Sequence, residues 1–309
     1  MSKNLEMKAA GIQPQKKVRN RFSDNGFSWL ILAVPLFLYI IFRLLPAFEA
    51  VYLSLTNYSL LTLSGKFIGL QNYVQLFHDP VFWAALKNTV EYMIVTNFGT
   101  IIIGLGLAML LNRRKRGTVL ARAIIYIPAV LSVVVMSEIA IMVFGPSNTS
   151  LMNWIVHFFG VSQQNWLNNP RESLPSLMGM QLYQGMGTTM IFYLAALQGI
   201  PSHLYEAAKL DGANAWQVFY RITLPLLRPV TMMLIILGYI AGFQAFTQMQ
   251  IMTNGGPDNH TMSVVLYLYN NGFIDYKMGL ASAMGVCLFI IILVVSIVQF
   301  RISWRNQMN

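Results

Sequence analysis

Long apolar runs separated by shorter polar segments dominate this chain, and six of the runs are long enough to cross a membrane. Crossing a hydrocarbon core about 30 Å thick takes roughly 20 apolar residues, and such a run must be helical because a helix satisfies its own backbone hydrogen bonds. The sequence therefore predicts an all-α membrane protein with six transmembrane helices. These are expected at Phe27–Leu45, Val90–Leu111, Ala121–Phe144, Leu177–Leu197, Thr231–Gln250 and Leu280–Phe300.

Composition and charge agree with this pattern. The 309 residues are 56% hydrophobic and only 10% charged, which is unlike an ordinary soluble domain. A formal net charge of +10 could indicate a nucleic-acid partner, but sixteen of the 21 Lys and Arg residues fall on one side if the amino terminus is cytoplasmic. Arg43 would lie at the outer end of the first span and reach the interface. Both termini are therefore expected in the cytoplasm, and a nucleic-acid partner is not expected.

The chain divides into one membrane domain and two tails. Residues 1–26 form a basic cytoplasmic tail that can contact anionic membrane lipid or simply set the topology. Residues 27–300 form the membrane domain, and residues 301–309 form a second cytoplasmic tail. A basic segment before an apolar run is also typical of a cleaved secretory signal, but no small-residue cleavage site follows it. A retained first helix is therefore predicted.

The connection between the third and fourth spans contains the short apolar stretch LMNWIVHFFG. It is too short to cross a bilayer and is typical of a helix that lies at the membrane interface. Trp154 and Trp166 suit the aromatic belt at that level.

The cytoplasmic connection between the fourth and fifth spans, residues 198–230, is rich in helix formers. Pro201–Ser202 can start a short helix that runs to about Leu210, and Asp211–Gly212 can end it. A second helix should follow and end at Pro225. A polar helical hairpin between two spans is suited to contact with another protein.

Small and apolar residues in this hairpin indicate how a partner could bind. Ala207, Ala208 and Ala213 would allow the backbone of a partner to approach closely. Phe219 and Ile222 would supply apolar anchors.

This hairpin closely resembles the coupling-loop motif of permease subunits in bacterial ATP-binding-cassette importers. Further segments resemble the same sugar permeases, which are similar to the larger permease subunit of the maltose transporter: PAFEAVYLSLTNYSL, FIGLQNYVQLF, YIPAVLS and TNGGP. The resemblance covers nearly the whole chain after the basic tail. The residues that carry the motif are Glu206, Ala207, Ala208, Asp211, Gly212, Ala213, Phe219 and Pro225.

The resemblance implies a type I importer permease of the bacterial plasma membrane, in which this chain pairs with a second permease as a heterodimer. It also implies a separate ATPase dimer that binds ATP and magnesium, and a solute-binding protein outside the membrane that delivers a carbohydrate. In this interpretation Glu206 contacts the ATPase; the alternative is that it only stabilises its own helix.

The residues agree that this chain has no chemistry of its own. It contains no G-x-x-x-x-G-K-[ST] phosphate loop, so no nucleotide cofactor is expected on it. Its four histidines lack the paired spacing of a zinc site, and neither a metal site nor catalytic residues are expected. The sequence therefore predicts a transporter subunit and not an enzyme.

Amides and aromatic residues within the spans are the candidates for a carbohydrate pathway, because sugars are bound by hydrogen bonds and by packing on aromatic rings. Buried amides are costly without partners, so they should face a pathway or a neighbouring helix. In the fifth span Gln244, Thr247 and Gln248 are expected to share one helical face because of their i, i+3, i+4 spacing. The candidates are Gln181, Tyr183 and Gln184 in the fourth span and Phe243, Gln244, Thr247 and Gln248 in the fifth.

The segment Asn254, Gly255, Gly256 and Pro257 predicts a tight turn in the outer connection between the last two spans. It is a candidate contact for the docked solute-binding protein. A turn without any partner is the alternative.

Two other functions remain open from the residues. Permeases for glycerol phosphate or another polyol-like solute are related, but an anionic substrate would favour a buried cation in the pathway. Arg43 is the only basic residue placed well inside a predicted span, and it lies at an end of that span. A proton-coupled secondary transporter could use Glu138 as a relay. It would not require the coupling-loop motif, so a neutral sugar importer is the preferred hypothesis.

Overall fold

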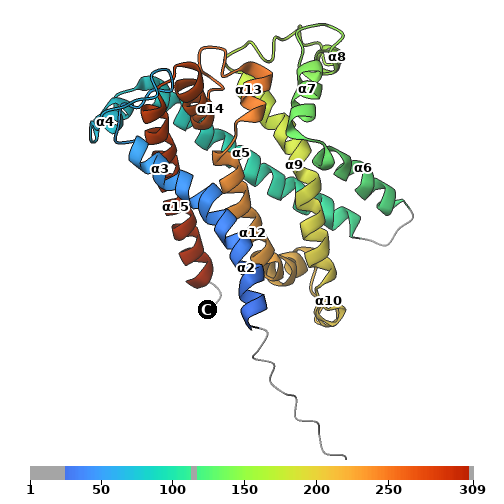
Figure 1. The fold of residues 1–309 in the computed structure, drawn as a ribbon. Coiled ribbons are helices and arrows are strands. Elements are labelled where there is room, and N and C mark those ends of the chain that lie inside the picture. Colours follow the sequence, from blue (N-terminus) through green and yellow to red (C-terminus); the bar gives the residue numbers. More distant parts are fainter. Residues whose placement is uncertain (1–24, 113–116, 306–309) are drawn as a thin grey trace, which may run out of the picture. The chain divides into compact units, whose positions relative to one another are not determined.

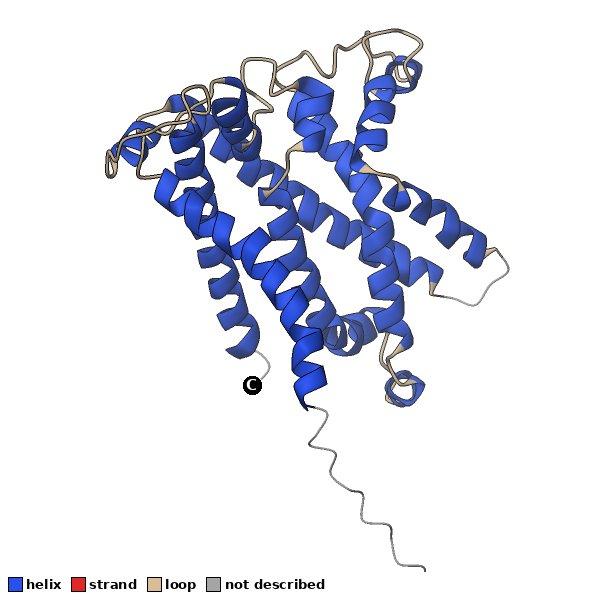
Figure 2. Cartoon of the chain, viewed as in Figure 1, coloured by secondary structure: helices blue, strands red, loops and turns tan. Residues whose placement is uncertain are grey.

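The computed structural model describes residues 25–112 and 117–305 of the chain. Within these ranges the protein is built from helices and loops (Figure 2), and the only β pairing is two isolated bridges, Thr56 with Phe67 and Ser59 with Ser64. Most of the predicted basic tail, the basic residues 113–116 and the last four residues lie outside the described ranges. The predicted all-α class is confirmed for the described part.

The chain forms two compact units, residues 1–49 and residues 50–309. The first contains α2 (Asn25–Tyr39), the π-helical turn η2 (Ile40–Leu44) and the start of α3 (Leu45–Leu53). The apolar helix Ile31–Leu53 has the length and composition of a membrane span. It continues past Leu45, the predicted end of the first span, so Arg43 lies well inside this helix and not at its end.

In the second unit, α10 lies at one end, while α8, α13 and α14 lie at the other (Figure 1). The long helix α5 packs against both α9 and α12, and these three helices form most of the interior of the unit. The elements in chain order are α4 (Gln71–Phe77), α5 (Pro80–Leu111), α6 (Thr118–Val130), α7 (Val133–Val143), α8 (Leu151–Phe158), α9 (Ser173–Gln198), α10 (Ser202–Leu210), α11 (Ala215–Val218), η3 (Phe219–Thr223), α12 (Leu224–Phe243), α13 (Thr247–Thr253), α14 (Val264–Tyr269), η4 (Asn270–Ile274) and α15 (Met278–Arg305).

Four helices among the described residues are long and apolar enough to cross a membrane, or five if α6 and α7 together make one bent span. Apart from the α6–α7 pair, the candidate spans of the second unit are Pro80–Leu111, Ala215–Phe243 and Met278–Arg301. The 26-residue helix α9 is long enough but falls outside this set. Its Gly, Ser, Thr and Gln residues make it less apolar than the others. The chain is thus a multi-pass membrane protein.

The predicted third span is broken, not continuous. α6 and α7 meet at an angle of 101° on either side of Leu131–Ser132. The side chain of Ser132 accepts a hydrogen bond from the Val135 N–H and so caps the start of α7. From α9, the Gln184 Nε2 donates to the Leu131 carbonyl at 3.0 Å, which satisfies a backbone group that the break leaves open. The prediction of one helix over Ala121–Phe144 was wrong because hydropathy does not register a cap inside an apolar run.

Pro225 does not end a helix, contrary to the prediction. The turn η3 is π-helical, and the Leu224 N–H just before the proline donates to the Phe219 carbonyl five residues back. A widened turn reduces the clash between the proline ring and the preceding turn, so the helix continues from Ala215 to Phe243. The turn η2 precedes Pro46 in the same way.

The predicted fifth span Thr231–Gln250 ends early, at Phe243. Gln244 is the C-cap residue of α12, and a new helix, α13, begins at Thr247. Gln244 and Thr247 therefore do not share a helical face, and the i, i+3, i+4 relation predicted for them was wrong.

Close packing of α5 on α9 depends on a small residue at Gly104. A Cβ added there would lie 2.7 Å from the Thr189 Cβ and 3.0 Å from the Met190 backbone nitrogen. Gly106, on the exposed side of the same helix, would meet nothing within 4 Å. Approach of backbones at small residues is a principal means by which membrane helices associate.

We expect Gly104→Ala to lower the stability of the purified complex by about 1–3 kcal/mol through overpacking. Gly106→Ala is the matched control and should be neutral or slightly stabilising, because alanine favours a helix over glycine by about 1 kcal/mol. Thermal unfolding of both variants in the same detergent measures the difference. Equal losses in the two variants would show that the α5–α9 crossing does not depend on Gly104.

Candidate functional site

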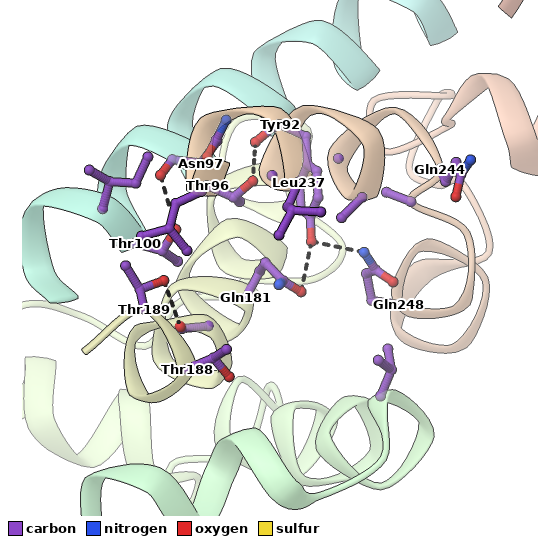
Figure 3. A pocket seen from close by; sticks show the side chains of 18 of the residues that line it. Tyr92, Thr96, Asn97, Thr100, Gln181, Thr188, Thr189, Leu237, Gln244 and Gln248 are labelled. Atoms are coloured by element: carbon purple, nitrogen blue, oxygen red, sulfur yellow. Dashed lines mark hydrogen bonds between the residues drawn. The ribbon is translucent and has the colours of Figure 1, made fainter. Parts of the chain in front are cut away.

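A cavity of about 520 Å³ lies in the second unit between α5, α9, α12 and α13, next to the first residue of α7. None of its lining residues is Asp, Glu, Lys, Arg or His. Figure 3 shows that the polar side chains come from several helices. They are Tyr92, Thr96, Asn97, Thr100, Gln181, Thr188, Thr189, Gln244, Thr247 and Gln248.

Three of these side chains form a network that joins α5, α9 and α13 (Figure 3). The Gln248 Nε2 donates to the Tyr92 hydroxyl at 2.9 Å, and that hydroxyl donates to the Gln181 Oε1 at 3.4 Å. Tyr92 and Gln248 are both buried. Since the network uses one group of each amide, the Gln248 Oε1 and the Gln181 Nε2 are the groups available to a ligand.

The structure separates the predicted pathway residues into two sets. Gln184 donates a hydrogen bond to the Leu131 carbonyl at the break between α6 and α7. Tyr183 is exposed on α9, and Phe243 is buried in the apolar core. These three do not line the cavity. The predicted residues that do line it are Gln181, Gln244, Thr247 and Gln248.

The α5 side of the cavity was missed by the sequence analysis. Thr96 donates to the Tyr92 carbonyl at 2.7 Å, and Thr100 donates to the Asn97 carbonyl at 2.9 Å, so both hydroxyls are satisfied within their own helix. Asn97 donates across to the Ile235 carbonyl of α12 at 3.0 Å. The available signal was the spacing of Tyr92, Thr96 and Thr100 four residues apart, which places them on one face.

Two acidic residues of the membrane helices in the second unit do not line the cavity. Glu91 on α5 and Glu138 on α7 are both exposed, and neither lines it. Glu138 is therefore poorly placed for a proton relay through this part of the protein.

The α10–α11 hairpin, residues 202–223, has the local geometry expected from the sequence. α10 ends at Leu210, and Gly212 has a φ of +73°, in the left-handed region that glycine tolerates best. The Ala213 N–H then donates to the Ala208 carbonyl at 2.9 Å, which closes the end of α10. Asn214 begins α11 with a capping box.

The exposed face of this hairpin differs in part from the prediction. Glu206 is exposed in the second turn of α10. Leu210 and Trp216 are 89% and 70% exposed. Phe219 and Ile222, the expected anchors, are half-buried within the hairpin. The large hydrophobic side chains exposed on the hairpin are therefore Leu210, Trp216 and Tyr220.

The predicted tight turn forms at the opposite end of the unit. Asn254 and Gly255 both have positive φ, at 48° and 83°. From α5, the Asn88 Nδ2 donates to the Asn259 carbonyl at 2.8 Å and to the Met262 carbonyl at 3.1 Å. These bonds hold the segment after the turn against α5, so it is a fixed part of the surface.

A second contact ties the same connection to the start of α5. The Tyr267 hydroxyl donates to the Asp79 Oδ2 at 2.5 Å. Burial, followed by the hydrogen bond to Asp79, raises the pKa of Tyr267 to about 12. Tyr267 therefore stays protonated, and remains a donor to Asp79, over the physiological pH range.

Comparison with known proteins places this geometry in a family. The family described as binding-protein-dependent transport system inner membrane component matches residues 100–306, more than half of the chain. The arabinooligosaccharides transport system permease protein AraP of Bacillus subtilis is 34% identical over 284 residues, covering 91% of this chain and 90% of the relative. The multiple sugar-binding transport system permease protein MsmF of Streptococcus mutans is 35% identical over 295 residues, covering 94% and 99%.

Two further similarities are informative. The sn-glycerol-3-phosphate transport system permease protein UgpA of Salmonella typhimurium is 29% identical over 283 residues, covering 91% of this chain and 95% of the relative. A chain in the crystal structure of a bacterial alginate ABC transporter, in complex with a periplasmic protein bound to alginate pentasaccharide, has a TM-score of 0.80. At 23% identity, with 93% of this chain and 98% of that chain covered, it shows a shared fold.

These findings confirm the resemblance that the hairpin motif indicated and the expectation of a transport component that is not an enzyme. The chain belongs to the family of binding-protein-dependent transport system inner membrane components.

Proposed function

We propose that this chain is a permease subunit of an ATP-driven importer and forms half of the pathway for a neutral carbohydrate. The observation that carries the proposal is the cavity, which is lined by amides and hydroxyls and by no charged side chain. Such groups bind sugar hydroxyls, and Phe192 and Phe246 add aromatic surface to the lining. The names of the arabinooligosaccharide and multiple-sugar relatives support the same class of substrate.

Glycerol phosphate, or another polyol-like solute, is the second candidate because a related permease carries that name. A phosphate group in a cavity of low polarity needs a cation or a positively charged partner. The described lining supplies none. The neutral substrate is therefore favoured.

For the topology we propose six spans, with α9 added to the five candidates. α9 is less apolar because its amides and hydroxyls face the cavity and neighbouring helices, so they need not meet lipid. Lys209, Arg221 and Arg228 lie in or next to the α10–α11 hairpin, which supports a cytoplasmic position for that end. Both termini would then be cytoplasmic, in a bacterial plasma membrane.

For the coupling to ATP hydrolysis we propose that the α10–α11 hairpin docks on a separate ATPase dimer, which holds the ATP and magnesium. The exposed Glu206, together with Leu210 and Trp216, would make the contact, while Gly212 sets the angle of the turn. A second permease would complete the pathway as a heterodimer, and the turn at 254–257 would contact the solute-binding protein. A proton-coupled mechanism is not supported, because Glu138 lies outside the cavity lining.

Purification of the chain from its native membrane tests the proposal. We expect an ATPase subunit and a second permease to co-purify, and hydrolysis to increase when a sugar-loaded binding protein is added. Stimulation by a phosphorylated ligand alone would replace the neutral substrate with an anionic one. A chain that purifies alone and carries solute in response to a proton gradient would overturn the proposal.

We expect Gly212→Val to impair uptake by distorting the hairpin. A β-branched residue at positive φ is strained by about 1–2 kcal/mol or more, although space for the side chain is available. Gly212→Asn is the matched control, since asparagine adopts this conformation with little strain. Uptake should therefore fall in the valine variant and be largely retained in the asparagine variant. Equal uptake in both would show that the backbone conformation at Gly212 is unimportant.

A further inference from the structure

The short helix α8 presents a continuous apolar face that no described residue covers. Leu151, Trp154, Ile155 and Phe158 follow the i, i+3, i+4, i+7 spacing of one helical face. Their side chains are 53%, 64%, 37% and 82% exposed. Four large apolar residues at this spacing are the pattern of an amphipathic helix that binds an apolar surface.

The opposite side of α8 is fixed to the protein by Asn153, which is only 2% exposed. Its Nδ2 lies within hydrogen-bond distance of the carbonyls of Gly145, Ser147 and Gln164, at 3.0–3.2 Å. Its Oδ1 accepts from the Gln164 N–H at 3.0 Å and from the Trp166 Nε1–H at 2.9 Å. These hydrogen bonds set the orientation of α8. With Asn153 bound to the surrounding loop, the apolar face on the other side of the helix points outward.

The low charge of the surrounding segment indicates that this face contacts lipid. Residues 145–170 contain no Asp, Glu, Lys or Arg, and His157 is the only side chain in α8 that can be charged near neutral pH. The charged residues of this connection, Arg171 and Glu172, stand at its far end, directly before α9. A segment of this length without charge suits immersion among lipid headgroups, where charged residues are not needed for solubility.

The position of α8 gives the same result. It follows α7, one half of the bent candidate span, whose Val134, Ile139 and Met142 are exposed. α8 lies across the end of α7, at the end of the unit away from α10 (Figure 1). A membrane helix with exposed apolar side chains therefore precedes α8 in the chain, and the tryptophan on the apolar face of α8 is the residue type enriched at interfaces.

We propose that α8 lies in the membrane interface and inserts its apolar face into the lipid leaflet at the end opposite α10. It would anchor the far end of α7, whose first residue, Val133, lines the cavity. Because residues 145–170 include no Lys or Arg, the attachment of α8 is hydrophobic and does not require anionic lipid. The occupant is the bilayer and not the solute-binding protein, and the inference does not depend on which substrate is transported.

Spin labels at neighbouring positions test the proposal in the intact complex. The native cysteine is first removed by Cys287→Ser, so that a label reacts only at an introduced cysteine. Labels are then attached through Phe158→Cys, Ile155→Cys or His157→Cys. The first two positions are on the apolar face, and position 157 is the matched control outside it. Each complex is reconstituted in phosphatidylcholine vesicles, and collisions of the label with oxygen and with a water-soluble nickel chelate are measured.

We expect oxygen collisions to dominate at positions 155 and 158, at a depth of about 5–10 Å into the headgroup and acyl boundary. Nickel collisions should dominate at position 157. Adding phosphatidylglycerol should leave the depth of the labels in the bilayer unchanged. Adding salt at about 0.5 M, which screens surface charge, should also leave it unchanged.

Two results would overturn the proposal. In the first, positions 155 and 158 are as accessible to nickel as position 157, so the face is in water. In the second, they are accessible until the solute-binding protein is added and are then shielded, which would make α8 a protein docking surface. The use of two labelled positions on the face separates either result from a local effect of one substitution.

Discussion

Glu206→Lys is expected to abolish uptake while the permease remains in the membrane and the ATPase subunits remain active. Glu206 is exposed in the centre of α10, beside the 89% exposed Leu210, so its carboxylate can contact a partner directly. Replacing a charge in a desolvated contact costs about 2–5 kcal/mol, and a cationic replacement adds repulsion if the partner group is basic. This corresponds to more than a tenfold loss of docking affinity.

The measurement is uptake of the substrate together with ATP hydrolysis by the reconstituted complex, with and without loaded binding protein. Lys209→Glu is the matched control, because it reverses an exposed charge on the same helix at the edge of the exposed face. It should leave uptake within about twofold, since an exposed charge at a rim contributes at most about 1 kcal/mol. Normal uptake by Glu206→Lys would refute the docking role of this residue.

Gln248→Leu is expected to raise the substrate concentration needed for half-maximal uptake by about tenfold. Leucine is similar in size but removes the donor to the Tyr92 hydroxyl and the Oε1 that is available to a sugar. Each lost hydrogen bond of this kind costs about 0.5–1.5 kcal/mol, and an unsatisfied buried partner costs more. A loss of 1.4 kcal/mol is a factor of ten in affinity.

The matched control for this prediction is Gln250→Leu, which makes the same change two residues further along α13 at a position that does not line the cavity. Uptake by this variant should be unchanged. ATP hydrolysis in the absence of substrate should be the same in both variants, because neither residue belongs to the α10–α11 hairpin. Equal effects of the two substitutions would show that α13 acts by its stability and not by contact with the substrate.

Local features of the α10–α11 hairpin could be predicted from the sequence because they depend on neighbours in the chain. The end of α10 at Leu210 and the turn at Gly212 follow from a short helix and a residue that tolerates positive φ. Pro225 was misread because a π-helical turn, which no residue type signals, accommodates the proline ring. The same limit applies to Ser132, a helix cap hidden within an apolar run.

Only part of the cavity lining could be predicted, because the lining joins segments that are far apart in the sequence. Gln181 and Gln248 stand out in apolar runs because an amide there is costly. Tyr92 was not singled out, although its hydroxyl joins both amides, because the three residues lie in segments far apart in the sequence. Gln184 looked equivalent to Gln181, yet it bonds the backbone at the break in the third span.

The sequence by itself determined that this is a helical membrane protein, which family it resembles, and where its polar hairpin lies. Hydrophobic length, charge distribution and turn residues act locally, so they can be recognised without a fold. Only the tertiary structure decided which polar residues line the cavity, which side chains of the hairpin are exposed, and that α8 holds an apolar face outward. These depend on contacts between distant segments, in which a residue such as Gln184 or Phe219 is used for packing and is no longer available to a ligand or a partner.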